Sequence, residues 1–142
     1  MSKNSPVIVF EGYRVIHIEY SCNPAYEFPA GEVNYKFNFN KALEKIDEHH
    51  VQENLRINVF HGADEYENSP YKLSASMAGI FSCEDEFKEP WESNMVAIMY
   101  PYLRSLVSTI SSNSGRPSIT LPTVNVAAMF RDKKTNEDPV QK

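Results

Sequence analysis

The chain has 142 residues, 42% of them hydrophobic and 23% charged, which suits one globular domain and argues against wholesale disorder. The net charge of −5 and the absence of a basic stripe oppose a nucleic-acid surface, which needs clustered lysine and arginine. No apolar run is long enough for a secretory signal or a membrane span. We therefore expect a cytoplasmic protein.

Four segments alternate between apolar and polar residues with a period of two, which is typical of strands with one buried and one solvated face. Such sheets are usually antiparallel, because parallel sheets are buried on both sides. In the first strand we expect one face to carry Arg14, Ile16, Ile18, Tyr20 and Cys22. In the second, Val33, Tyr35, Phe37 and Phe39 share a face. The predicted strands are Tyr13–Cys22, Val33–Asn40, Glu53–His61 and Tyr71–Ser82.

The connections between these segments differ in character. Residues 23–31 contain two prolines and are long for a hairpin, so they predict a crossover over the sheet. Residues 41–50 fit either a helical turn, with Leu43 and Ile46 on one side, or a mobile loop. The acidic, turn-rich residues 62–70 are typical of a solvated hairpin tip.

After the strands the hydrophobic period becomes helical, over residues 89–112. Pro101 predicts a kink or a fresh helix start, because it lacks a backbone donor. Residues 116–121 should be extended, and Asn125 is placed to cap a short final helix. Strands followed by helices indicate an α+β domain in which a four-stranded antiparallel sheet carries a long kinked helix and a short C-terminal helix on one face.

The sequence contains no convincing catalytic or metal-binding pattern. His49 and His50 are sequence neighbours, and a solvated pair in a loop explains them better than a metal site. Cys83 precedes three acids, which raise rather than lower a thiol pKa. With Cys22 it is expected to be a free thiol rather than half of a disulfide. We therefore expect a protein that is not an enzyme and that has no cofactor and no metal.

Three phrases carry a family resemblance: Ala-Gly-Ile-Phe-Ser at 78–82, Tyr-Pro-Tyr-Leu-Arg at 100–104, and Leu-Pro-Thr-Val-Asn-Val-Ala-Ala-Met-Phe at 121–130. Their order and spacing resemble the SecB protein-export chaperones. The resemblance covers about residues 13–131, leaving an N-terminal arm at 1–12 and a flexible tail at 132–142. It implies an ATP-independent holdase that binds unfolded polypeptides, with preproteins for export among them, and that performs no covalent chemistry.

The resemblance also implies where clients and partner subunits bind. Most apolar residues of the sheet should simply form the core beneath the long helix, and the rest should line a groove. The implied client groove comprises Tyr26, Phe28, Val33, Tyr35, Phe37, Val126, Met129 and Phe130. Excess apolar residues on the helix should contact another subunit in a homotetramer, or failing that a dimer. The expected interface residues are Trp91, Met95, Met99, Leu103 and Leu106.

The chain departs from the family where the export motor SecA docks on an acidic sheet face. Only Glu19 falls where an acid is expected, which leaves it as the SecA contact. Asn23 replaces a second acid, and Lys72 and Ser74 stand where an apolar residue and an acid belong. The tail is short and contains three lysines. Chaperone fold and holding activity are thus better supported than service to SecA.

Two alternatives stay open. One is a dedicated SecB-like chaperone of a single partner, such as an antitoxin. The other is a small-ligand binding protein or enzyme that shares only the sheet-and-helix architecture, as in hot-dog folds. Those folds insert the long helix among the strands, whereas here it follows all four.

Overall fold

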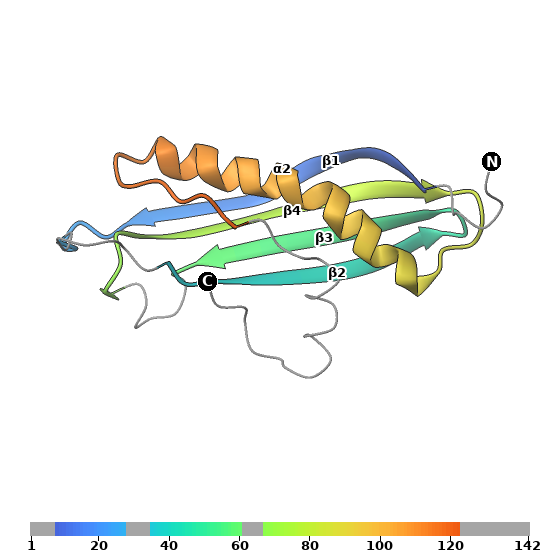
Figure 1. Ribbon diagram of the computed structural model, residues 1–142, viewed down its shortest axis with the longest axis horizontal. Helices are drawn as coiled ribbons and strands as arrows, with labels where there is room; N and C mark the ends of the chain where they lie inside the picture. The colour runs from blue at the N-terminus through green and yellow to red at the C-terminus, as the bar shows by residue number, and fades with distance from the viewer. Residues whose placement is uncertain (1–7, 28–34, 61–66, 123–142) are drawn as a thin grey trace.

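The computed structural model describes residues 8–27, 35–60 and 67–122, which form a four-stranded antiparallel sheet with one long helix across one face (Figure 1). This is the sheet and long helix expected from the sequence. The predicted final helix and the tail lie outside the described residues. The elements are β1 (Ile8–Cys22), β2 (Phe37–Asp47), β3 (His50–Val59), β4 (Tyr71–Cys83), the 3₁₀ helix η1 (Glu89–Trp91) and α2 (Glu92–Ser112).

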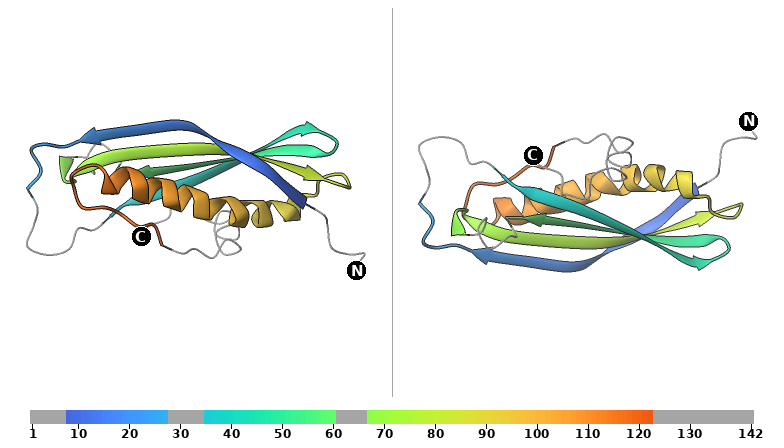
Figure 2. Two further views of the ribbon diagram at one scale, coloured as in Figure 1. Left: turned by 90° about the horizontal axis from the view of Figure 1, so that it is seen from above. Right: turned by 90° about the horizontal axis from the view of Figure 1, so that it is seen from below.

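The strand order is β1-β4-β3-β2, so β1 and β2 are the two edges. Cys22 at the end of β1 lies opposite Tyr71, and Phe37 at the start of β2 lies opposite Val59, so both connection ends are at one end of the sheet. Consecutive strands thus lie at opposite edges of the sheet, and residues 28–34 of the predicted crossover lie outside the described residues. Figure 2 shows the strong twist of the sheet and the helix against a single face.

The core lies between α2 and the odd-numbered residues of β3 and β4, which confirms the alternation predicted for these two strands. Leu55 pairs with Met77 and Ile57 with Ala75, so the apolar side chains of both strands line up in rows under the helix. Fully buried apolar side chains are Val51, Leu55, Ile57, Val59, Tyr71, Leu73, Ala75, Met77, Phe81, Met95, Val96, Met99, Leu103, Val107 and Leu121.

The face expected for β1 is wrong in its first half. The register with β4 shifts between Phe10 and Gly12, and again between Val15 and His17. Each bulge inserts one residue, and the second one moves Ile16 out of the alternation. Arg14 therefore faces away from the helix, whereas Ile18, which was expected on the same side as Arg14, faces it. β1 also begins five residues earlier than predicted.

Residues 41–50 form neither a helical turn nor a loop, since β2 continues through Asp47 and turns directly into β3. The prediction failed because lysines occupy core-facing positions: Lys41 pairs with Leu55 and Lys45 with Val51. β3 ends at Val59 because Phe60 has a φ of 55°, a left-handed conformation that stops the strand.

α2 neither breaks nor restarts at Pro101. Pro101 and Ala97, whose carbonyl loses its helical partner, are both exposed, so the freed carbonyl is on the solvent side of the helix. The helix ends as expected, with Asn113 as its C-cap and Gly115 at a φ of 80°.

The two cysteines are free thiols, as expected. Cys22 pairs with Tyr71 and Cys83 with Ile8, so the thiols lie at opposite ends of the β1–β4 pair. A disulfide cannot span that distance. Cys83 is buried, and burial raises the pKa of its thiol.

Gly79 marks the closest approach of sheet and helix. A methyl carbon at this position would lie 2.7 Å from Met99 Sδ, so we expect Gly79→Val to lower the free energy of unfolding by about 1–3 kcal/mol through overpacking. Urea denaturation measures the change, with Ser76→Val on the opposite face as the control. Equal stability of both variants and the wild type would show that the helix does not pack this closely.

Candidate functional site

The chain after α2 is held beside the sheet by side-chain hydrogen bonds to its carbonyls. Tyr71 donates its hydroxyl to Pro117 O at 3.1 Å, and Tyr100 donates to Pro122 O at 2.7 Å. The other donors are Tyr35 to Ser118 O at 3.4 Å, Ser108 to Ile119 O at 3.3 Å and Arg104 Nε to Leu121 O at 2.7 Å. Residues 117–122 thus form a fixed wall, which we call the pinned segment.

Aromatic rings surround the start of β2 beside this wall. Tyr35 packs on Phe60 with ring centroids 5.4 Å apart, and Phe60 packs on Tyr71 at 6.0 Å. Phe39 meets Tyr100 edge-on at 5.8 Å. Tyr35 and Phe39 are only partly buried, so this corner of the core reaches the surface. Burial raises the pKa of Tyr35, and that of Tyr100 to about 12, so both hydroxyls stay protonated donors at neutral pH.

Three residues of the expected client groove lie in the described part of the chain. Tyr26 and Tyr35 are partly exposed, whereas Phe37 is 8% exposed and belongs to the core. The remaining expected residues, Phe28, Val33, Val126, Met129 and Phe130, lie outside the described part of the chain. Sequence reasoning omitted Phe39 from the groove, although it shares a face with Phe37.

The expected subunit interface on the helix needs correction. Met95, Met99 and Leu103 are fully buried between α2 and the sheet of one chain, so they have no surface to offer a second copy. Trp91, at the end of η1, and Leu106, on α2, are half-buried against the core. The large apolar residues that α2 does expose are Ile98 and Tyr102, at 37% and 43%.

Most of the exposed large apolar side chains among the described residues lie on β1, which the sequence analysis did not assign to any function. Tyr13 and Tyr102 join this strand to the helix with ring centroids 4.9 Å apart, and both touch Phe10. We call this strand with Ile98 and Tyr102 the β1 surface. Its exposed large apolar residues are Val9, Tyr13, Val15, Ile16 and Ile18, from 40% to 60% exposed.

Glu19 does not stand as a free acid on the helix-free face of the sheet. Lys72 Nζ lies 3.9 Å from its carboxylate, and His17 Nε2 lies 3.9 Å from the other oxygen. The single acid expected to serve SecA is therefore already paired with a cation.

A carboxyl pair is buried under the start of α2. Glu53 on β3 is fully buried, Glu92 is 6% exposed, and Lys41 Nζ bonds Glu92 Oε1 at 3.1 Å. Neither oxygen of Glu53 has a hydrogen-bond partner among the described residues. Burial, and then the neighbouring Glu92, raise the pKa of Glu53 to about 9, so this carboxyl is neutral at pH 7.

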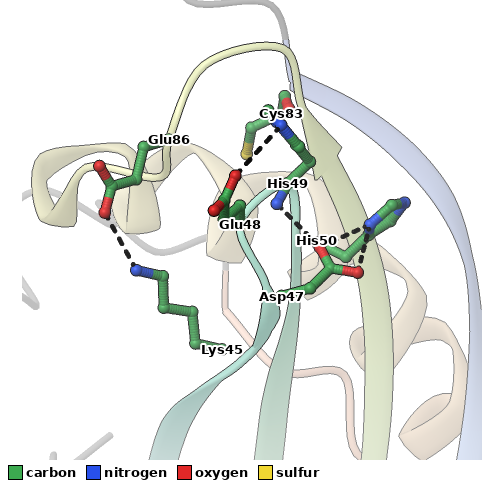
Figure 3. A network of polar contacts seen from close by, with 7 residues as sticks. All are labelled: Lys45, Asp47, Glu48, His49, His50, Cys83 and Glu86. Atoms are coloured by element: carbon green, nitrogen blue, oxygen red, sulfur yellow. Dashed lines mark hydrogen bonds and ion pairs between the residues drawn. The ribbon is translucent and has the colours of Figure 1, made fainter.

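The tip of the β2–β3 hairpin carries a polar network (Figure 3). Asp47 accepts a hydrogen bond from His49 N at 2.8 Å and contacts His50 Nδ1 at 2.9 Å, and these contacts lower the pKa of its carboxyl. His49 Nδ1 lies 3.0 Å from Cys83 O. Within residues 8–27, 35–60 and 67–122, no cluster of histidine, cysteine or carboxylate side chains has metal-binding geometry. The contacts of Asp47 lie within the turn, and that of His49 joins the turn to the end of β4.

Comparison with known proteins decides the family. Residues 18–137 match the family described as preprotein translocase subunit SecB. The chain belongs to the SecB family. This confirms the resemblance seen in the three sequence phrases, and the fold agrees with it.

Individual relatives of this SecB-family chain are distant. An uncharacterized protein of Methanocaldococcus jannaschii is 31% identical and is aligned over 94% of this chain and 89% of its own length. The protein-export protein SecB of Dichelobacter nodosus is 24% identical over 69% of this chain and 64% of its own length.

Two solved structures share the fold. A SecB-like chaperone of Mycobacterium tuberculosis, in complex with a ChAD peptide from the HigA1 antitoxin, superposes with a TM-score of 0.66 at 16% identity, covering 83% of this chain and 90% of its own. A protein of unknown function from Streptococcus agalactiae superposes with a TM-score of 0.55 at 12% identity, covering 84% of this chain and 99% of its own.

The described helix is too polar to cross a membrane.

The buried Glu53 predicts an unusual pH dependence. The unfolded chain ionises this group near pH 4.5, whereas the folded chain keeps the proton up to about pH 9. The folded state binds more protons in that window, so this group makes stability fall as pH rises through it. We expect Glu53→Gln to raise the free energy of unfolding at neutral pH by about 2 kcal/mol and to flatten this slope.

Chemical denaturation at several pH values measures the effect. Glu48→Gln is the matched control, because the Glu48 side chain is 88% exposed at the hairpin tip. A Glu53→Gln variant that keeps the wild-type slope would show that Glu53 ionises normally.

Proposed function

We propose that this protein is an ATP-independent molecular chaperone, a holdase that binds unfolded polypeptides. The observation that carries the proposal is a surface of partly exposed aromatic rings between β2 and the pinned segment, in a chain of the SecB family. The proposal requires no catalysis and no cofactor.

The geometry suits reversible capture of varied chains. Tyr35 and Phe39 present rings whose apolar faces accept many side chains without fixed hydrogen-bond geometry. Burial of each client side chain contributes about 1.5–3 kcal/mol, which offsets part of the cost of ordering the client and leaves dissociation possible. In this proposal Tyr26 and Tyr35 begin a groove that continues along residues outside the described ranges: Phe28, Val33, Val126, Met129 and Phe130.

We further propose that the chain works as a homo-oligomer through the β1 surface. A 15-residue edge strand with exposed apolar residues is a template for pairing with another strand, and natural proteins cover such edges. An isologous contact between two copies would bury the β1 edge of both chains at once. A tetramer is the assembly proposed, with a dimer as the smaller alternative. Cytoplasmic location belongs to the same proposal.

The second candidate function is that of a dedicated chaperone for a single partner. The ion pair between Glu19 and Lys72 favours this function over delivery of preproteins to SecA. A free acidic face for SecA is missing from the described residues, and Lys72 lies on that face. The SecB-like fold neighbour of Mycobacterium tuberculosis is bound to an antitoxin peptide, so a single partner of that kind is a reasonable client here. A pull-down that recovers many unrelated unfolded proteins would instead favour the general holdase.

Tyr35 is the described residue most suited to test client binding. Tyr35→Ala should weaken capture of a chemically unfolded client about tenfold, equivalent to roughly 1.4 kcal/mol, because one apolar contact is lost. Light scattering of the diluted client, titrated with chaperone, gives the concentration needed to suppress aggregation. Phe87→Ala is the control, since Phe87 packs on Trp91, away from β2. A wild type that never delays aggregation would refute the holdase.

Two isoleucines at opposite sheet edges test the β1 surface. Ile16 is 60% exposed on β1 and Ile46 is 53% exposed on β2. Ile16→Glu should reduce the mass of the assembly, because it places a charge where strands meet, whereas Ile46→Glu should not. Sedimentation velocity distinguishes the species. Equal masses for both variants and the wild type would contradict the assembly through β1.

A further inference from the structure

The face of the sheet that α2 leaves uncovered has a defined arrangement of side chains. The register with β4 places Arg14, Ala78 and Asn54 in one row across β1, β4 and β3. The next row contains His17, Ser76 and Arg56, and Asn40 of β2 completes it. None of the residues in these two rows is acidic, although the chain as a whole carries a net charge of −5.

The arginines of this face have no acidic partner among the described residues. Arg56 donates only to a neutral amide, from its Nε to Asn58 Oδ1 at 3.3 Å, and Arg14 forms no ion pair with any described carboxylate. The acidic residues closest to these two rows already contact other side chains. Glu19 lies beside Lys72 and His17, Glu44 accepts from Gln52 at 3.2 Å, and Glu11 accepts from Ser82 Oγ at 2.7 Å.

The centre of this face consists of small residues flanked by longer polar ones. Ser74 is fully buried and Ala78 is 5% exposed, although α2 packs on the other face of the sheet. The longer side chains of the flanking strands shield them and form the outer surface. Several of these are linked: Asn58 Nδ2 donates to Asn38 at 3.0 Å, and Ser74 Oγ donates to Asn58 at 2.8 Å. Arg14 and Arg56 therefore extend from a surface of small residues and hydrogen-bonded polar side chains.

We propose that this face docks an extended acidic segment of a partner protein. Guanidinium groups bind carboxylates with two parallel hydrogen bonds, and the amides and hydroxyls between them suit a peptide backbone. The face carries no tyrosine, phenylalanine or tryptophan among the described residues, so it lacks the large aromatic rings on which single-stranded nucleic acids usually stack their bases. The net negative charge of the chain also opposes a long polyanion. Because α2 and the aromatic surface lie on the other face, the two sites are separate.

The test uses a fluorescein-labelled peptide in which glutamate alternates with threonine, in a fluorescence anisotropy titration at low salt. The wild type should bind it, and the same peptide with glutamine in place of glutamate should not bind. The Arg14→Gln/Arg56→Gln variant should bind about tenfold more weakly, because two charge-assisted contacts are lost. The control, Lys45→Gln/Lys88→Gln, removes the same charge elsewhere and should keep wild-type affinity.

Backbone amide NMR of the wild type locates the contact independently, with shifts expected at Ser76 and Ala78 on β4. Failure of the wild type to bind the glutamate peptide would overturn the proposal. Equal weakening in both double variants would also overturn it, since it would reduce the effect to net charge. Tighter binding of polyuridylate than of the peptide, lost in the arginine variant, would make this a nucleic-acid surface instead. None of these outcomes depends on client holding, because the peptide contains no large apolar residue.

Discussion

The width of a single helix determines how much of the sheet can be buried in this protein. An α-helix with its side chains is about 10–12 Å across, whereas neighbouring strands are about 4.8 Å apart, so one helix covers roughly two strands. α2 accordingly buries the odd-numbered residues of β3 and β4 completely, and leaves apolar side chains on β1 and β2 partly exposed. The architecture itself therefore leaves apolar surface exposed, because α2, the one long helix among the described residues, cannot cover all four strands.

The two edges of the sheet deal with this surface differently. Near β2, the hydroxyls of Tyr71 on β4 and Tyr100 on α2 hold the pinned segment in place, so the aromatic corner has a rigid wall on one side and partly exposed rings on the other. At β1, no described segment covers Val15, Ile16 or Ile18. An adaptable apolar corner suits transient unfolded clients, whereas a long regular strand edge suits a permanent, identical partner. One constraint therefore supports both halves of the proposed function.

Much of this fold could be predicted from the sequence, because β3, β4 and α2 follow their hydrophobic periods closely. β1 could not, since its bulge near Ile16 shifts the alternation, and only pairing with β4 reveals a bulge. The long hairpin was missed because Lys41 occupies a core-facing position, which its pairing with the buried Glu92 explains. For the site, the sequence singled out Tyr35 but not Phe39 of β2, and it could not separate Met95 and Met99 from Ile98 and Tyr102. A wide apolar stripe does not show which side meets the sheet.

The most direct test of the account is light scattering of the purified protein, alone and after a chemically unfolded client is diluted into it. The account predicts a discrete species of more than one copy, which captures the client as a larger, soluble complex of defined mass. A protein that remains a single copy at every concentration, and leaves the client to aggregate, would contradict it. That result would mean that the exposed surfaces of β1 and β2 bind neither another copy nor an unfolded chain.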